Sequence, residues 1–401
     1  MKENKKIVVI GGGAAGFFGA INAAAFHPGA EILILEKGTQ LLGKVKVSGG
    51  GRCNVTHACF DPNELVRFYP RGEKELLGPF HQFMTGDTVA WFSERGVELK
   101  TESDNRMFPQ SNSSQTIIDC FLSEAQKSGI QIRTQCGIHS LHRENEKWIV
   151  KTENETIAAD KILLTAGSSI QVWELLRKLG HTIIDPVPSL FTFNCKDPRI
   201  ATLPGISVPH AIVRIVGSTI ETEGPLLITH WGFSGPAVLR SSAWGANWLA
   251  EKNYSCTFMI SWNGQTQKET LAELRTLRDN EGKKICSASP LYEIPQRLWK
   301  TICDYCSITD IKWASLSNKQ IELLAKEISA AEFQLEGKST FKDEFVTAGG
   351  IDLAEVNMKT MESKLFPGLF FAGEILNIDA ITGGFNFQAA WTTSFIAAKS
   401  L

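Results

Sequence analysis

The chain has 401 residues and a formal net charge of −2, from 41 Lys and Arg against 43 Asp and Glu. That length exceeds a usual single domain of about 100–200 residues, so we expect two or three domains. The balanced charge gives no strong field for nucleic acid or an anionic membrane, and 43% hydrophobic residues with 34 glycines exclude a disordered or fibrous chain.

The first predicted elements form a strand, a helix and a second strand. Residues 6–10 are a continuous apolar run bounded by glycine, 14–26 are alanine-rich, and 30–38 contain another apolar run. Together they predict a βαβ unit with buried parallel strands. The same start also resembles a signal peptide, but the glycine triplet and Asn22 disfavour that interpretation. No other stretch approaches the roughly 18 apolar residues that would span a bilayer, so no membrane partner is predicted.

The predicted secondary structure changes near residue 188, from mixed helices and strands to short alternating strands. Residues 62–126 are mostly helical in pattern with polar loops, 130–167 predict a β-meander, and 171–180 a helix with Gly180 as its C-cap. After residue 188, short alternating strands predict an antiparallel barrel or sandwich, with one helix over 236–250. Residues 266–332 are amphipathic and helical, with shared faces formed by Leu271, Leu274 and Leu277 and by Ile321, Leu324 and Ile328. Pro295 suits the first turn of a helix.

Nine cysteines, an odd number without regular spacing, are typical of a reduced protein, so we expect a cytoplasmic location. Cys303 and Cys306 form a CxxC motif in a helical segment, and two core thiols are favoured there over a metal or redox pair. No metal site is predicted.

The sequence "GGGAAG" at 11–16 follows the first strand and predicts a dinucleotide site. Gly11 permits a tight turn, Gly13 lets the backbone approach a pyrophosphate, and Gly16 lets the helix pack close to the strand. Glu36 lies 20 residues later, at the end of the second strand, where an acid accepts hydrogen bonds from a ribose. The helix N-terminus would face the phosphates.

The opposite end of the chain favours FAD over NAD. "GLFFAGE" at 368–374 is an apolar strand that ends in Gly373 and Glu374. It resembles the second such strand of glutathione-reductase-type FAD enzymes, which puts an acid beside the ribityl chain, and Glu374 could take that role. "TGGFNFQAA" at 382–390 then begins a helix, so the N–H groups of Gly384, Phe385 and Asn386 would face the flavin N1/O2 edge. We also expect FAD contacts from Ala14, Ala15, Lys37, Ile138, Thr165, Ala166 and Gly167.

Several motifs resemble the bacterial BaiN-like and aminoacetone-oxidase-like family of FAD-dependent oxidoreductases. They are "GKVKVSGGGRCNVT" at 43–56, "NRMFP" at 105–109, "HWGFSGP" at 230–236, "TAGGI" at 347–351 and "FFAGEILNIDAITGGFNFQAAWTTS" at 370–394. The resemblance spans nearly the whole chain. It departs at "TAGSSIQVWELLRKLGH", where the family has a longer glycine-rich loop, which weakens inference about the substrate.

The resemblance implies an α/β fold: a glutathione-reductase-like FAD-binding Rossmann-type domain with an inserted antiparallel β-barrel and a small helical insert. The expected segments are the FAD domain's first part (1–188), the barrel (189–264), the helical insert (265–332), the barrel's last strands (333–346) and the FAD domain's C-terminal part (347–401). It also implies that Lys44, Ser48, Gly49, Gly50, Arg52 and Asn54 lie along the FAD. For Arg52 a surface ion pair is the alternative.

Few side chains suit proton transfer or substrate binding. His230 could pass a proton to substrate, or instead order the junction between barrel and flavin. Asp104 and Arg106 could bind a charged substrate or form a loop salt bridge, and Trp231 could line a substrate pocket or pack in the core. Cys53 has no CxxxxC partner, which argues against a disulfide-reductase mechanism.

The sequence therefore predicts an FAD-dependent oxidoreductase that transfers hydride through flavin N5 to or from a small-molecule substrate. The donor would be transiently bound NADH or NADPH. Two alternatives remain: an amine oxidase that reduces O₂ to H₂O₂, and a flavoprotein of RNA modification or a non-catalytic flavin-binding module. The near-neutral charge argues against nucleic acid as a partner. The oligomeric state is not predicted.

Overall fold

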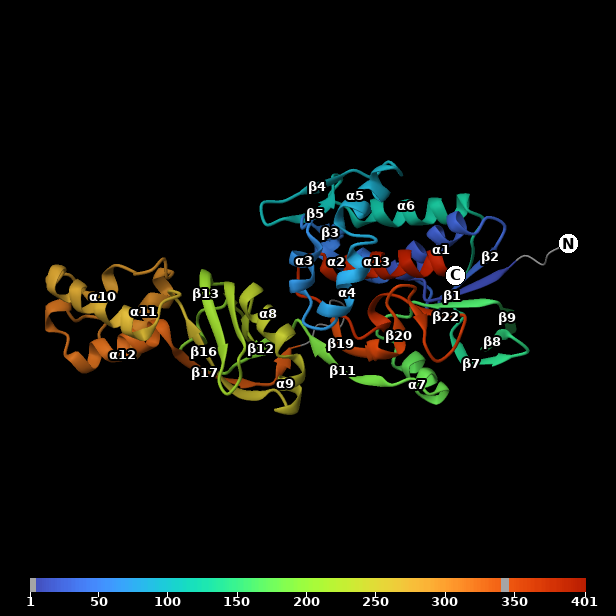
Figure 1. Ribbon diagram of the computed structural model, residues 1–401. Helices are drawn as coiled ribbons and strands as arrows, with labels where there is room; N and C mark the ends of the chain where they lie inside the picture. The colour runs from blue at the N-terminus through green and yellow to red at the C-terminus, as the bar shows by residue number, and fades with distance from the viewer. Residues whose placement is uncertain (1–4, 340–345) are drawn as a thin grey trace. The chain divides into compact units, whose positions relative to one another are not determined.

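The computed structural model describes residues 5–339 and 346–401 (Figure 1). The chain divides into two compact units, Met1–Val187 with Lys342–Leu401 and Pro188–Phe341. The charged start of the signal-peptide alternative and part of the segment predicted over 333–346 fall outside the described residues. The division into five segments stays a prediction.

The first unit is built on a seven-stranded sheet in the order β20-β21-β22-β10-β1-β2-β6. Its parallel strands are β1 Lys6–Ile10, β2 Glu31–Leu35, β6 Gln131–Arg133, β10 Lys161–Leu164 and β22 Leu369–Phe371, and β20 Val356–Asn357 and β21 Glu362–Ser363 add an antiparallel edge. The central strands are apolar and buried on both faces, as parallel strands between helices must be. The predicted βαβ unit is confirmed.

Two buried helices pack together in this unit (Figure 1). They are α1 Ala14–Phe26 and α13 Phe385–Ser400, the predicted first and last helices. Both are apolar around most of their circumference, which suits a helix enclosed on all sides. The ring of Phe18 lies 5.2 Å from that of Trp391, and Ser394 Oγ donates to the Ala15 carbonyl over 2.9 Å. This is a Rossmann-type architecture in which both ends of the chain build one core.

The remaining elements of this unit surround that core. The helices are α2 Gly43–Gly51, α3 Pro62–Leu65, α4 Glu73–Phe80, α5 Thr85–Ser93, α6 Ser114–Lys127 and α7 Ile170–Leu179, with short 3-10 turns η1 Val66–Phe68, η4 Leu353–Glu355 and η5 Gly373–Ile375. The smaller sheets join β3 Thr56–His57, β5 Arg106–Pro109 and β4 Leu99–Thr101; β7 Ile138–Glu144, β8 Lys147–Thr152 and β9 Thr156–Ala159; and β11 Ile183–Ser189 with β19 Val346–Ile351.

One hairpin of this unit was not predicted from the sequence, whereas the meander and the cap of α7 were. The polar stretch expected as a loop within 62–126 contains the hairpin of β4 and β5, because Asn105 adopts a left-handed backbone (φ 64°) that closes its turn. The predicted meander is confirmed by β7, β8 and β9. Gly180 caps α7 in the left-handed conformation, as predicted.

The second unit contains another seven-stranded sheet, in the order β17-β16-β13-β14-β15-β12-β18. Its strands are β12 Thr192–Asn194, β13 Ser207–Ile215, β14 Glu221–Ile228, β15 Gly232–Ser234, β16 Ser255–Ser261, β17 Ala331–Glu336 and β18 Lys338–Ser339. Every pairing is antiparallel, as predicted, but the pairings describe an open order, so closure into a barrel stays a prediction. The helix predicted over 236–250 is divided at Gly245 into α8 Pro236–Trp244 and α9 Ala246–Glu251.

The amphipathic segment of this unit forms three helices with two short 3-10 turns, η2 Cys286–Ala288 and η3 Trp313–Ser315. The helices are α10 Gln267–Asn280, α11 Gln296–Tyr305 and α12 Asn318–Ser329. Their predicted apolar faces pack on one core, although Leu271 and Leu277 are only partly buried. Pro295 is the N-cap of α11, one residue before the first turn predicted for it. None of the described helices has the length and apolar character to cross a bilayer.

Cys303 and Cys306 of this unit, and Cys53 of the first unit, are buried in the two hydrophobic cores. Burial raises the pKa of Cys303 and of Cys306 to about 12, and that of Cys53 also to about 12. At neutral pH these thiols are therefore protonated and poor nucleophiles. Among the described residues no cluster of His, Cys, Asp or Glu has the arrangement of a metal site.

Candidate functional site

The glycine turn before α1 is shaped to receive a phosphate group. A Cβ on Gly11 would lie 2.4 Å from the Thr165 carbonyl oxygen, and one on Gly16 would lie 1.9 Å from the Gly11 oxygen, so both positions exclude a side chain. A Cβ on Gly13 would meet nothing within 4 Å, so space is open in front of the turn. The helix has no side-chain cap and no acid in its first turn. Its first N–H groups therefore suit an anion.

Glu36 is held at the end of β2 by the same turn. Its Oε2 accepts from the Gly12 N–H over 2.8 Å and its Oε1 accepts from the Gly38 N–H over 2.7 Å. These bonds fix the carboxylate beside the glycine turn, as a ribose-binding acid requires. Lys37 is exposed next to it, and Ile138 is buried at the start of β7.

The residues after β10 complete this end of the site. Thr165 Oγ donates to the carbonyls of Ile10 and Gly11, each over 3.0 Å, which ties β10 to the glycine turn. Ala166 and Gly167 follow, and a Cβ on Gly167 would have only Glu374 Oε2, at 3.6 Å, within 4 Å. Gly167 also has a positive φ of 58°.

A second glycine-rich segment kinks within α2. Ser48 is extended, and Gly49, Gly50 and Gly51 all have positive φ, of 58°, 68° and 82°. A Cβ on Gly50 or Gly51 would meet nothing within 4 Å, so this backbone also borders open space. The sequence predicted this segment as a cofactor contact, but it did not predict that the segment begins as a helix at Gly43.

The polar side chains around this segment have protein partners. Arg52 pairs with Glu102 over 2.6 Å and its guanidinium lies 4.0 Å above the Phe108 ring, which is the ion-pair alternative stated for it. Lys44, half exposed, pairs with Glu374. Asn54 is buried, and its Oδ1 has no hydrogen-bond partner among the described residues. A buried amide oxygen without a partner is costly unless a ligand supplies one.

The turn before α13 presents N–H groups and hides its carbonyls. Gly384 is the N-cap of a 16-residue helix with no side-chain cap and no acid in the first turn. The backbone N–H groups of Gly384, Phe385 and Asn386 have no acceptor among the described residues. A Cβ on Gly384 would lie 2.6 Å from the Thr56 carbonyl, so β3 is packed directly against the turn. The positive end of the helix dipole is thus left for an anion or an electron-rich group.

The two uncapped helix N-termini and the open glycine backbones together fit FAD. One N-terminus follows the βαβ glycine motif and suits the pyrophosphate, and the other suits the flavin edge on which charge accumulates. The unpartnered Asn54 oxygen lies 2.8 Å from the Cβ position of Gly384, which places the α2–β3 segment at the second of them.

The residues predicted to bind substrate lie in both units of the chain. Asp104 and Arg106 pair with each other over 2.7 Å, the salt-bridge alternative. His230 and Trp231 lie between β14 and β15 of the other unit and are exposed, Trp231 by 59%, so Trp231 does not pack in a core. A catalytic role for His230 stays a prediction.

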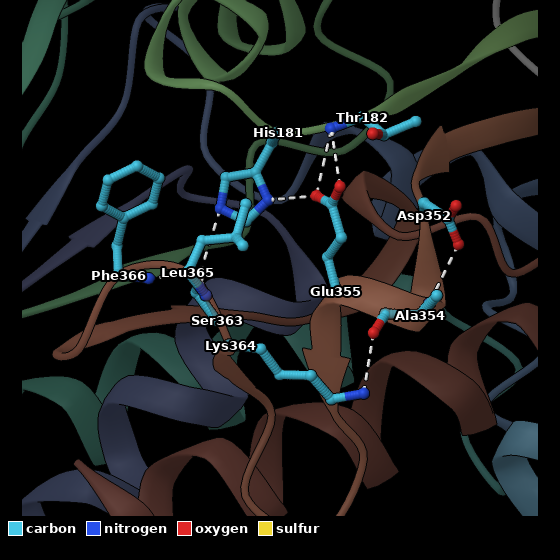
Figure 2. Close-up of polar contacts among 9 residues, drawn as sticks. All are labelled: His181, Thr182, Asp352, Ala354, Glu355, Ser363, Lys364, Leu365 and Phe366. Carbon is cyan, nitrogen blue, oxygen red and sulfur yellow. Dashed lines mark hydrogen bonds and ion pairs between the residues drawn. The ribbon is translucent and has the colours of Figure 1, made fainter.

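Sequence reasoning missed a buried polar cluster in the first unit (Figure 2). His181 donates from Nδ1 to Glu355 over 2.7 Å and accepts at Nε2 from Ser363 over 3.1 Å. This Ser-His-Glu order resembles a hydrolase triad, but Ser363 is 6% exposed and its Oγ accepts from the N–H groups of Leu365 and Phe366. Those two bonds fix the serine in a turn, so the cluster is structural.

Electrostatics in this cluster keep Glu355 ionised. Partial burial raises the pKa of the Glu355 carboxyl, but hydrogen bonds from Thr182 and His181 outweigh burial and hold it below 4.5. Residues 352–354 and 356–359, on either side of Glu355, border a cavity of about 610 Å³ together with Arg71 and Lys364. Lys364 is tied to the Ala354 carbonyl over 2.7 Å, and Arg71 pairs with the buried Asp379.

Comparison with known proteins gives this geometry a family. The model of the HI0933-like protein Rossmann domain matches residues 5–400. The ribosomal RNA dihydrouridine synthase of Escherichia coli is 26% identical over 410 residues, 100% of this chain and 98% of that protein. The 3-dehydro-bile acid delta(4,6)-reductase of Clostridium scindens is 25% identical over 406 residues, 98% of both chains.

A solved structure shares the fold. The 3-ketosteroid-delta4-(5alpha)-dehydrogenase of Rhodococcus jostii RHA1 aligns with a TM-score of 0.51 at 14% identity, over 100% of this chain and 98% of that one. The chain belongs to the HI0933-like Rossmann-domain family, and it is an FAD-dependent oxidoreductase, as its motifs predicted.

Proposed function

We propose that the chain reduces a carbon–carbon double bond conjugated with a carbonyl group in a small organic molecule, with NADH or NADPH as electron donor. The supporting relatives carry names for reactions of one type. A delta(4,6) bond system beside a 3-dehydro group is a conjugated ketone, and dihydrouridine is uridine with its carbonyl-conjugated double bond saturated. Both substrates are electron-poor alkenes, which accept hydride.

The observation that carries this proposal is the uncapped N-terminus of α13. When FAD is bound, it supplies hydride transfer at flavin N5. The N–H groups of Gly384, Phe385 and Asn386 would stabilise negative charge at the adjacent edge, which favours the reduced cofactor that a reductase needs. The Gly13 turn and Glu36 would hold the adenosine diphosphate end.

The test is an anaerobic titration of the FAD-loaded protein with NADH and with NADPH, followed by a conjugated ketone such as an enone steroid. We expect one nucleotide to bleach the flavin band near about 450 nm, and the enone to restore it without oxygen. A band that neither nucleotide bleaches would contradict the proposal. Rapid restoration by air with H₂O₂, but not by the enone, would instead favour the oxidase alternative.

An RNA substrate is the second candidate, because the Escherichia coli relative is named for ribosomal RNA. Against it, the chain carries a net charge of −2, which gives no general attraction to phosphate. The two candidates separate on one assay: the reduced protein is incubated with ribosomal RNA, which is then digested and analysed by mass spectrometry. A gain of two hydrogens on a uridine would favour RNA, and unchanged nucleosides together with enone turnover would favour the small molecule.

A further inference from the structure

Two carbonyl groups at the N-terminus of α13, those of Gly383 and Phe385, accept hydrogen bonds from side chains elsewhere in the first unit. His57, on β3, contacts the Gly383 carbonyl from Nδ1 over 3.1 Å, and Tyr69 donates its hydroxyl to the Phe385 carbonyl over 2.6 Å. Since a carbonyl oxygen only accepts, the Nδ1 atom of His57 must carry a proton. Within the turn, the Asn386 side chain also bonds both the N–H and the carbonyl of Ala380.

Packing fixes both donors. The His57 ring lies 4.4 Å from the ring of Phe385, which in turn stacks on Phe68 at 4.3 Å. Tyr69 is fully buried, and burial raises its pKa well above the ordinary value, so its hydroxyl stays protonated and remains a donor. Neither residue was predicted from the sequence, and both lie within a few residues of β3 and α4, which flank α13 (Figure 1).

These contacts change the electrostatics of the turn. The Gly383 carbonyl shares a peptide group with the Gly384 N–H, and the Phe385 carbonyl shares one with the Asn386 N–H. A donor on each carbonyl polarises that peptide group and makes its N–H a stronger donor. The N–H groups of Gly384, Phe385 and Asn386 meanwhile stay without a protein acceptor. The N-terminus of α13 therefore has N–H donors that are free among the described residues, while its Gly383 and Phe385 carbonyls already accept hydrogen bonds from side chains.

We propose that His57 and Tyr69 are positioning residues for the flavin end of the site, which hold the Gly383 and Phe385 carbonyls so that the turn stabilises reduced flavin. This inference rests on the proposed function, because it takes FAD to lie at the N-terminus of α13. It assigns the two residues no contact with substrate and no proton transfer.

The test is the two-electron midpoint potential of the bound flavin, measured by anaerobic dithionite titration with a reference dye. H57F keeps a ring against Phe385 but removes the donor, and Y69F removes the hydroxyl alone. We expect each variant to bind reduced flavin about ten-fold less tightly relative to oxidised flavin, a potential about 30 mV more negative. H57N, whose amide nitrogen takes the place of Nδ1, should stay near the wild-type potential.

The matched control is H27F, because His27 makes the same kind of bond, over 2.9 Å, to the Ala398 carbonyl at the other end of α13. Its potential should equal that of the wild type. Wild-type potentials in both H57F and Y69F would overturn the proposal, as would an H27F shift of equal size. If H57F fails to fold, Y69F and H57N decide the matter. Dithionite reduces the flavin whatever the natural donor is, so failure of NADH or NADPH to react would count against the proposed function and not against this inference.

Discussion

Gly13 differs from Gly11 and Gly16 in what an added side chain would meet. Its neighbours Gly11 and Gly16 are glycines for the fold, since a Cβ on either would collide with backbone. At Gly13 a Cβ meets nothing, and the backbone φ of −93° suits any residue. Neither packing nor backbone conformation demands glycine there, so the predicted close approach to a pyrophosphate is the reason that we propose for it.

We therefore expect G13L to fold and to lose FAD. The side chain would project into space that the protein leaves open, so the melting temperature of the FAD-free protein should change little. The FAD dissociation constant, measured by equilibrium dialysis, should rise at least about 100-fold, near 3 kcal/mol. G78L, at another glycine with nothing within 4 Å of a Cβ, is the control and should bind FAD normally. Equal FAD affinity in G13L and wild type would contradict this placement.

Glu355 makes stability depend on acidity. Its carboxylate form is favoured by Thr182 and His181, so its pKa in the folded protein lies below that of the unfolded chain. The resulting stability is present above the unfolded pKa, about 4.3, and is lost as the pH falls through the folded value.

We expect E355Q to be less stable than wild type by about 1–2 kcal/mol near neutral pH, since a hydrogen bond to a charged acceptor is replaced by a neutral one. The gap should close at a pH below the folded pKa of Glu355. Urea unfolding curves of both proteins across that range measure it. A gap that is the same in acid and at neutral pH would show that charge on Glu355 does not stabilise the fold.

At the scale of elements, α13 and the turn before it are packed directly against β3. Gly384 combines a positive φ of 94° with Cβ contacts of 2.6 Å to Thr56 and 2.8 Å to Asn54. Even alanine would push β3 and the turn apart.

G384A should accordingly destabilise the FAD-free protein by more than about 1 kcal/mol, in contrast to G13L. It should also weaken FAD binding, because the N–H groups of the turn move with the backbone. Chemical denaturation and equilibrium dialysis on the same preparation separate the two effects. Wild-type stability in G384A would mean that β3 and the turn are not in contact as described.

The sequence predicted elements well where one local pattern decided them. The βαβ unit, α7 with its Gly180 cap, and α13 follow from apolar runs, glycines and helical periodicity. The hairpin of β4 and β5 was missed because its strands are only three and four residues long and its pairing depends on Asn105 in a left-handed turn. The break at Gly245 was missed because each flanking segment alone reads as helix.

The candidate site was predictable in its glycines and less so in its side chains. The glycine spacing correctly put Gly11, Gly13 and Gly16 at the turn into α1 and Gly384 at the start of α13, while their contacts with FAD stay a prediction. His57 and Tyr69 act on carbonyls more than 300 positions away, and no local signal marks such a contact. The same holds for His181, whose partners Glu355 and Ser363 are far along the chain.

At the scale of the whole molecule, the first and last segments of the chain build one core, and the proposed FAD site takes one end from each. The N-termini of α1 and α13 come from residues 14 and 385, and the two helices pack on each other around Phe18 and Trp391. The second unit, which holds His230 and Trp231, is inserted between them. Removing residues after 368 should therefore abolish FAD binding although the βαβ motif is intact.

The measurement that tests this account most directly is the flavin content of the purified full-length protein after incubation with FAD and exhaustive dialysis. We predict one FAD per chain, with an absorbance band near about 450 nm, and none in G13L. No retained flavin in the wild-type protein, or equal flavin in wild type and G13L, would contradict the claim that the glycine turn and α13 hold the two ends of one FAD.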